Sequence, residues 1–180
     1  MKNLLLTAFA VFSLTFSSCK NDKKDDLEVK TVENMAAADM AVEDSKSLKF
    51  NDEVVGAIFI QYNDLKNALV DSDAEMASLE ASNLMTALAN KGVEENVLKA
   101  AQNIVEATDI DAQRVAFVGV TTGVEAMVAG TLDEGTIYKQ YCPMAFDNKG
   151  ASWLSSNVEI RNPYFGNKML KCGRVEAEIK

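Results

Sequence analysis

The helical spacing of apolar residues between positions 51 and 135 constrains this chain more than any other feature. Apolar side chains recur there at intervals of three and four, which places them on one face of a helix. Four such faces are expected, made of these residues: Val54, Ile58, Tyr62, Leu65 and Leu69; Met76, Leu79, Leu84 and Leu88; Val97, Ala101, Ile104 and Val105; Phe117, Val120, Val124 and Met127.

The boundaries between these segments carry helix start and stop signals. Asn51-Asp52 suits a cap for the first helix, and Asp71-Ser72-Asp73 ends that helix and caps the next. Gly92 suits a left-handed C-cap, the third helix is expected at about 94–107, and the fourth from about 111 to 130. Short connections make neighbouring amphipathic helices antiparallel. The predicted fold is therefore mainly α, an up-down-up-down four-helix bundle.

The composition excludes several classes of function. The 180 residues include no histidine, so Ser-His-Asp triads, Cys-His nucleophile pairs and HExxH zinc helices are all excluded. The formal net charge of -9 argues against nucleic acid as a partner, because that binding depends on Lys and Arg. No paired carboxylates suggest catalysis and no small-molecule substrate is indicated, so we do not expect an enzyme.

The first 18 residues are interpreted as a signal peptide. Lys2 places a positive charge before a mainly apolar run from Leu4 to Phe16, and small residues follow at 17 and 18. A helix of 13 residues is about 20 Å long, which is short of the roughly 30 Å hydrocarbon core of a bilayer. Cys19 comes next and resembles the acylated cysteine of bacterial lipoproteins, although Phe16 occupies the position usual for leucine. The alternative is an ordinary signal peptide with an incidental cysteine.

Residues 19–50 are interpreted as the lipidated cysteine and a tether. From Lys20 to Phe50 the chain has 14 charged residues in 31, with neither proline nor glycine and few large apolar groups. Such a segment cannot bury enough apolar surface to offset its ordering entropy. We therefore expect export across the inner membrane and a lipid-anchored protein in the cell envelope, facing the periplasm or the cell surface, whose folded domain comprises residues 51–180.

The last 45 residues differ in composition from the predicted bundle. Residues 136–180 contain both prolines, the only tryptophan and both remaining cysteines, and their net charge is +3 against -11 for residues 51–135. Residues 136–141 and 174–180 alternate as strands do and could pair as a small ribbon. Turns are expected at 147–150 and 161–163. We predict a short irregular or β tail that packs on the bundle, to which it is electrostatically attracted.

The tail also carries a specific resemblance. Tyr-Cys-Pro-Met-Ala at 141–145, Trp153-Leu154, Asn-Pro-Tyr-Phe-Gly at 162–166 and Met-Leu-Lys-Cys-Gly at 169–173 are similar to a bacterial domain family of unassigned function. That family looks like a helical bundle followed by this signature. It occurs alone in secreted lipoproteins and also fused to periplasmic adaptor subunits of copper and silver efflux pumps. The resemblance implies an envelope protein connected with soft metals, with metal-efflux components as possible partners.

Four sulfur atoms of the tail form the candidate site. Cys142 and Met144, with Met169 and Cys172, offer two thiols and two thioethers, and soft sulfur ligands select Cu(I) or Ag(I). The site requires two separate stretches of the tail to fold together. Tyr141, Trp153, Tyr164 and Phe165 could wall the site but are expected to pack in the core, and Met76, Met85 and Met127 are expected as core residues and not as ligands.

A disulfide between Cys142 and Cys172 is the main competing interpretation, and two inert thiols are the third. An oxidising envelope would permit it, and closing a loop of about 31 residues would stabilise the fold by roughly 3.5 kcal/mol in the chain-entropy model. The protein would then be a non-metal interaction module. A thiol oxidoreductase is less favoured, because the two cysteines are thirty residues apart and have no adjacent base.

Overall fold

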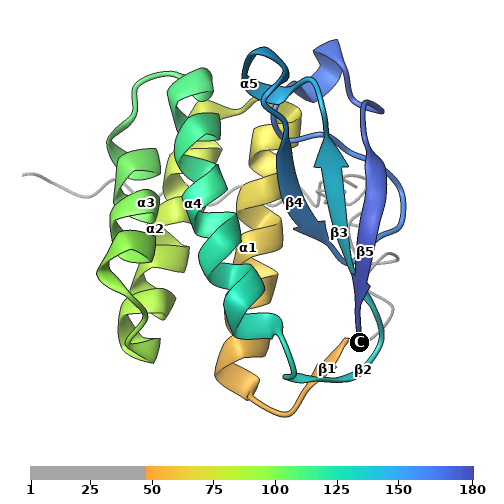
Figure 1. Cartoon of the computed structure of the whole chain (residues 1–180). Helices are drawn as coiled ribbons and strands as arrows, with labels where there is room; N and C mark the ends of the chain where they lie inside the picture. The colour runs from red at the N-terminus through yellow and green to blue at the C-terminus, as the bar shows by residue number, and fades with distance from the viewer. Residues whose placement is uncertain (1–47) are drawn as a thin grey trace, which may run out of the picture. The chain divides into compact units, whose positions relative to one another are not determined.

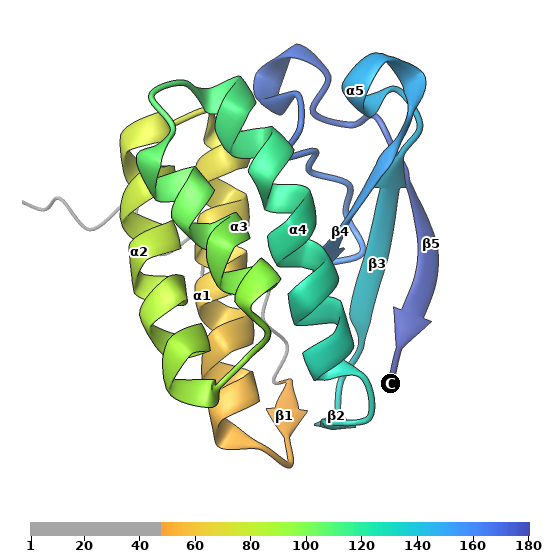
Figure 2. The ribbon, with the colours of Figure 1, turned by 60° about the vertical axis from the view of Figure 1, so that its left-hand side comes forward.

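Four long helices and a small antiparallel sheet make up the domain. The computed structural model describes residues 48–180. The helices are α1 (Glu53–Asp71), α2 (Ala74–Lys91), α3 (Glu95–Glu106) and α4 (Ile110–Val128). Consecutive helices run antiparallel (Figures 1 and 2). The predicted mainly α fold, four helices followed by a small β region, is confirmed.

The tail forms a three-stranded antiparallel sheet with strand order β4-β3-β5. Its strands are β3 (Ile137–Cys142), β4 (Ala151–Ser155) and β5 (Arg174–Ile179), and two short helical turns, α5 (Ala145–Asn148) and η1 (Gly166–Lys168), lie in the connections. Strand β4 lies nearest to α4 and β5 farthest from it (Figure 2). The predicted pairing of the first and last tail strands is confirmed, whereas the sequence did not predict the edge strand β4, which lies between them in the chain.

The helix boundaries follow the capping residues that the sequence indicated. The Asp52 carboxylate accepts the backbone N–H groups of Val54 and Val55 at 3.0 and 3.2 Å, and Asp73 accepts that of Met76 at 2.9 Å. These bonds satisfy N–H groups that the first turn of a helix leaves unpaired. Gly92 ends α2 with φ 75°, in the left-handed conformation that glycine adopts without a steric cost.

The prediction that they lie in the core is wrong for three residues. Val54, Met76 and Leu79 are 47, 44 and 54% exposed, whereas Val55, Ala77 and Ala81 are buried in their place. In α2 the inner face follows the small residues, because alanines let α2 approach its neighbours closely. The other predicted inward residues are buried or half-buried.

A buried tyrosine joins the sheet to the bundle. The Tyr62 hydroxyl accepts the backbone N–H of Leu154 in β4 at 3.0 Å and lies 2.9 Å from the Thr121 hydroxyl of α4. Its ring stacks on Phe117 with a centroid distance of 5.2 Å. Lys139 of β3 also forms a 2.7 Å ion pair with Glu125 of α4. The tail is therefore packed on the bundle, as predicted, and through both polar and aromatic contacts.

The folded domain begins before residue 51. Lys49–Phe50 form strand β1, which pairs with β2 (Leu132–Glu134), and the Phe50 ring packs 5.8 Å from that of Phe59. The sequence predicts a tether over residues 19–50, and the structure corrects this prediction at Lys49 and Phe50. The predicted signal peptide, Cys19 and the rest of the tether lie outside the described residues. Within residues 48–180, no helix is both long enough and apolar enough to cross a membrane.

Candidate functional site: a dithiol at the end of the sheet

The structure brings the two predicted cysteines into contact. The Sγ atoms of Cys142 and Cys172 are 3.2 Å apart, and both cysteines are free thiols. Cys142 is the last residue of β3 and is fully buried, whereas Cys172 is half-buried in the turn before β5. The pairing of β3 with β5 ends at Tyr141 and Arg174, so the two cysteines lie just beyond the last paired residues of these strands. This strand pairing brings together two cysteines that are thirty residues apart in the sequence.

The two predicted methionine ligands are placed differently from each other. Met169 is half-buried and belongs to the same turn as Cys172, whose backbone N–H donates to the Met169 carbonyl at 3.0 Å. Met144 precedes α5 and is 45% exposed. The structure thus brings the two thiols into contact and places Met169 in the same turn as Cys172, whereas the Met144 side chain is largely exposed to solvent.

The Cys172 thiol is not activated for nucleophilic chemistry. The neighbouring Cys142 thiol, with a smaller contribution from desolvation, raises the pKa of Cys172 above its ordinary value. A raised pKa keeps the thiol protonated at neutral pH, whereas a reactive cysteine needs a lowered one. A metal ion would therefore have to displace a proton from Cys172 on binding.

Aromatic side chains pack beside the dithiol. Trp153 and Tyr164 are buried with their rings 6.0 Å apart, and the Tyr164 hydroxyl donates to the Ser152 carbonyl at 2.6 Å. Phe146 packs edge-on against Tyr164 at 5.3 Å. The expectation that these aromatics pack in the core is confirmed for Trp153 and Tyr164, whereas Tyr141 and Phe165 are only partly buried.

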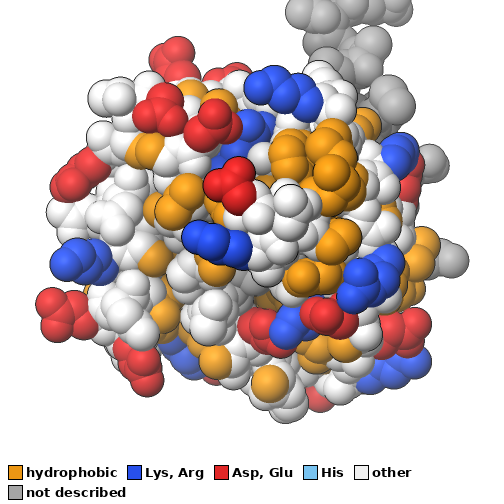
Figure 3. Space-filling view, turned by 45° about the horizontal axis from the view of Figure 1, so that its top comes forward, with side chains coloured by type: hydrophobic (Ala, Val, Ile, Leu, Met, Phe, Trp, Pro, Cys, Tyr) orange, Lys and Arg blue, Asp and Glu red, His pale blue; other side chains and the backbone are white. Residues whose placement is uncertain are grey.

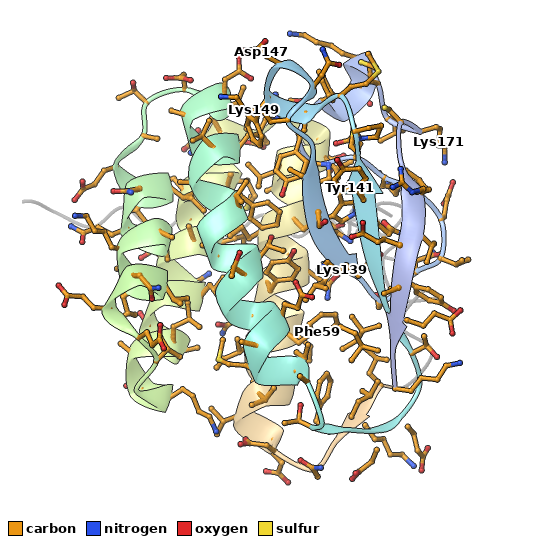
Figure 4. All side chains as sticks on the ribbon, viewed as in Figure 1. Phe59, Lys139, Tyr141, Asp147, Lys149 and Lys171 are labelled. Atoms are coloured by element: carbon orange, nitrogen blue, oxygen red, sulfur yellow. The ribbon has the colours of Figure 1, made fainter. Side chains whose placement is uncertain are left out.

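The connection after Cys142 has an unusual backbone. Phe146, Asp147 and Asn148 have φ values of 51, 56 and 65°, so three consecutive non-glycine residues are left-handed. Each such residue costs roughly 1–2 kcal/mol, a cost that the packing of Phe146 offsets in part. This turn carries Asp147 and Lys149 at the tip of the β3–β4 connection, while Tyr141 and Lys139 lie along β3 (Figure 4).

The surface around this end of the sheet is partly apolar. Figure 3 shows hydrophobic side chains gathered on the face that is turned forward, with basic and acidic side chains around them. Four exposed basic residues lie close in sequence to one of the two cysteines: Lys149, Lys168, Lys171 and Arg174. Lys171 pairs with Glu159, and the Arg174 guanidinium stacks 4.8 Å from the Tyr141 ring centroid.

The described residues contain no cluster of the usual metal-binding kind. Within 48–180, no three His, Cys, Asp or Glu residues gather closely enough to hold an ion. A groove of about 1020 Å³ runs along α1, where Phe59, Ile60 and Lys66 line it together with the segment 155–161, but neither cysteine is among its lining residues. The dithiol is therefore the candidate site.

Sequence reasoning missed two residues that support this site. Asn162 is fully buried and contacts the turn that carries Cys172, and Arg114 is buried and contacts the residue after Asn162. The sequence places Asn162 in a turn signal and in the tail motif at 162–166, but indicates no role for its side chain. An arginine at a position between the buried residues of a helix was the available signal for Arg114, since a charged side chain is rarely buried without partners.

The described domain is thus a bundle of four helices followed by a sheet at whose end two thiols meet. Residues 58–135 match the domain family described as "Protein of unknown function (DUF3347)". The match begins within α1 and ends after β2, so it covers most of the bundle and stops before the tail. No curated protein and no solved structure matches the chain significantly.

Proposed function

We propose that this chain is an envelope lipoprotein that binds or passes on Cu(I) or Ag(I) through the thiols of Cys142 and Cys172. The observation that carries the proposal is the 3.2 Å contact between two free thiols, one of them reachable from solvent. Two adjacent thiolates are ligands that soft monovalent metals prefer over hard cations. The buried Cys142 would fix one side of the site, and the half-buried Cys172 would leave an entry path for the ion.

The sulfur geometry supports this role after a small adjustment. If the metal–sulfur bonds are about as long as the roughly 2.3 Å bonds of zinc to cysteine, an ion in a linear arrangement between two thiolates separates the sulfurs by about 4.6 Å. The present separation would have to increase by about 1.4 Å, which a rotation of the half-buried Cys172 side chain can supply while the backbone of the turn 169–172 stays in place. Met169 lies in this turn and is the better placed thioether, whereas Met144 would need its exposed side chain to fold inward.

The predicted location and resemblance support the same conclusion. A signal peptide ending at a lipid-anchored Cys19 would place the domain at a membrane of the envelope, facing the periplasm or the cell surface. The tail motifs resemble those fused to adaptor subunits of copper and silver efflux pumps, so components of such pumps are the proposed partners. The protein would act as a metal carrier or buffer and not as an enzyme, because the raised pKa of the Cys172 thiol does not suit a nucleophile.

Competition for Cu(I) tests this proposal. The full chain with Cys19→Ser has Cys142 and Cys172 as its only thiols. We expect the reduced protein to withdraw Cu(I) from a chromophoric chelator and the Cys142→Ser, Cys172→Ser double variant to lose this ability. Equal competition by the two proteins would refute a dithiol site.

The role of the thioether is tested by a matched pair of methionine variants. Met169→Leu should weaken Cu(I) binding, because it removes the thioether sulfur from the turn that carries Cys172. Met85→Leu removes a half-buried methionine of α2 and should leave Cu(I) binding unchanged. If both variants bind Cu(I) as the parent does, the site consists of the cysteines alone.

The same contact favours a second candidate, an interaction module locked by a disulfide. A bond of about 2.05 Å would require the sulfurs to approach by about 1.2 Å, a movement similar in size to that needed for a metal. Mass spectrometry of freshly isolated protein, with and without alkylation, separates the two. A quantitative Cys142–Cys172 bond that persists when metal is added supports the interaction module.

A further inference from the structure

Asn162 holds the turn that carries Cys172. It is fully buried, and its side-chain Nδ2 donates to the Cys172 carbonyl at 2.8 Å. Its backbone N–H donates to the Leu170 carbonyl at 2.9 Å. Two hydrogen bonds from one buried residue therefore reach the four-residue turn that contains both Met169 and Cys172.

The remaining polar groups of Asn162 keep it in one orientation. Its Oδ1 accepts the backbone N–H of Tyr164 at 2.8 Å, and its backbone carbonyl accepts that of Gly166 at 3.0 Å. Because the amide side chain donates to one segment and accepts from another, rotating it would break both contacts. A buried amide bonded in this way acts as a rigid bracket between residues 164–166 and the turn 169–172.

Arg114 connects this bracket to the helical bundle. Its guanidinium Nε donates to the carbonyl of Pro163, the residue after Asn162, at 2.8 Å. Its Nη2 donates to the Leu69 carbonyl at 3.1 Å and to the Ser72 hydroxyl at 2.9 Å, both at the end of α1. The side chain of Arg114 is only 5% exposed, although it pairs with the exposed Asp111. One buried cation thus fastens residue 163 to two helices.

The fit at Gly166 shows how closely this segment approaches the bundle. Its φ is 55°, and a Cβ atom there would lie 2.3 Å from the Ser72 hydroxyl oxygen and 2.7 Å from the Val70 carbonyl. No side chain can be placed at this position without moving backbone. The segment 162–166 therefore packs against the C-terminal end of α1 and the first part of α4. The turn 169–172, which carries Cys172, is bonded to this segment.

We propose that Asn162 is a positioning residue of the dithiol. Arg114 holds the neighbouring Pro163 on the bundle, and Asn162 fixes the Cys172 turn so that the Cys172 thiol meets that of Cys142. The bracket lowers the entropy that the turn loses when both sulfurs take part in one bond or bind one ion. For metal binding this role rests on the proposed function. For the proximity of the two thiols it does not, which allows the two ideas to be tested separately.

The equilibrium of the thiol pair with glutathione tests the proposal. In this exchange the two protein thiols are oxidised to a disulfide, while glutathione disulfide is reduced to two glutathione thiols. Asn162→Asp keeps the size and the Oδ1 acceptor but replaces the donor facing the Cys172 carbonyl by an oxygen. In the Cys19→Ser full chain we expect its equilibrium constant for disulfide formation to fall about tenfold, as for the loss of one buried hydrogen bond. Asn162→Ser, which removes both side-chain contacts without adding a charge, repeats the test if the first variant does not fold.

Gln113→Glu provides the matched control. Gln113 is also fully buried and donates to a backbone carbonyl, that of Ala74 at 2.9 Å, but this contact joins α4 to α2. The control should lower the melting temperature while changing the glutathione equilibrium less than twofold. A folded Asn162 variant with the parent's equilibrium, or equal shifts in both variants, would overturn the positioning role.

Measuring Cu(I) binding on the same proteins separates this inference from the proposed function. If Asn162→Asp weakens Cu(I) binding in parallel with the glutathione equilibrium, both ideas are supported. If the parent binds no Cu(I) but the equilibrium still falls in the Asn162 variant, the positioning role stands and the metal proposal fails.

Discussion

At the scale of single residues, a few buried polar side chains determine how the tail sits on the bundle. Tyr62, Arg114 and Asn162 each bond to backbone groups of a different segment. Backbone groups that are buried without a partner cost about as much as a lost hydrogen bond. Apolar packing sets the helices side by side, whereas these polar contacts specify where the strands and loops of the tail are placed.

Removing one hydroxyl should therefore be costly at Tyr62. Tyr62→Phe leaves the Leu154 N–H without its acceptor and the Thr121 hydroxyl without its partner, both in the core. We expect the free energy of unfolding in urea to fall by about 1–3 kcal/mol. Tyr138→Phe is the control, because the Tyr138 hydroxyl makes no hydrogen bond within residues 48–180, and it should change stability by less than about 0.5 kcal/mol. Equal losses in the two variants would contradict this account.

At the scale of elements, small residues govern the packing of α3 on α4. A Cβ atom at Gly123 would lie 2.5 Å from both methyl groups of Val97, and one at Gly119 would lie 2.8 Å from the Ala100 Cβ. Contacts this short do not occur, so the two helices can approach to their present distance only because α4 has glycine at both positions. The sequence pattern identified the inward Val97 but assigned no role to these glycines.

Substitution at this contact should show strong coupling. Gly123→Ala improves helix propensity, yet it should destabilise the protein by about 1–3 kcal/mol because α3 must move away. Val97→Ala removes the two methyl groups and leaves only the Cβ of residue 97, 3.1 Å from the new Cβ, a contact that a small shift of α3 relieves. In that background, Gly123→Ala should be neutral or stabilising by up to about 1 kcal/mol. A double-mutant cycle by urea unfolding measures this, and additive effects would contradict the close approach.

The elements themselves could be predicted to a large extent. The caps at Asp52, Asp73 and Gly92 are local signals that the structure uses as expected, and so is the apolar spacing around Tyr62 and Phe117. Alternation identified β3 and β5 because each has a clear period of two. Strand β4 was missed because Ala151–Ser155 shows no alternation: four of its five residues are buried. Strand β1 was missed because two residues carry no periodicity.

At the scale of the whole domain, the site could be predicted only in part. The two cysteines could be selected from their residue type and their place in the tail motifs. Their contact depends on β3 and β5 pairing in one register, which brings Tyr141 opposite Arg174. The support from Asn162 and Arg114 depends on contacts over 10 and 49 residues, for which local sequence contains no signal. The grouping of all four sulfurs stays a prediction.

Two buried tyrosines and the Cys172 thiol also predict how the stability of the domain depends on pH. Burial raises the pKa of Tyr62 and that of Tyr164 well above 10, and the neighbouring thiol raises that of Cys172 above 9. A group whose pKa is higher in the folded state binds protons more tightly there, so its stabilising effect is present at neutral pH and is lost as the pH rises. The reduced protein should therefore have a lower melting temperature at pH 10.5 than at pH 7.

Two variants test which groups cause this loss. The double variant Cys142→Ser, Cys172→Ser should lose less stability between about pH 8 and 9.5 than the parent, because it has no thiols at these positions. Tyr62→Phe should likewise show a smaller decrease above about pH 10. Calorimetry across this range, with the thiols kept reduced, measures both differences, and parallel curves for all three proteins would contradict the assignment of the alkaline loss to these groups.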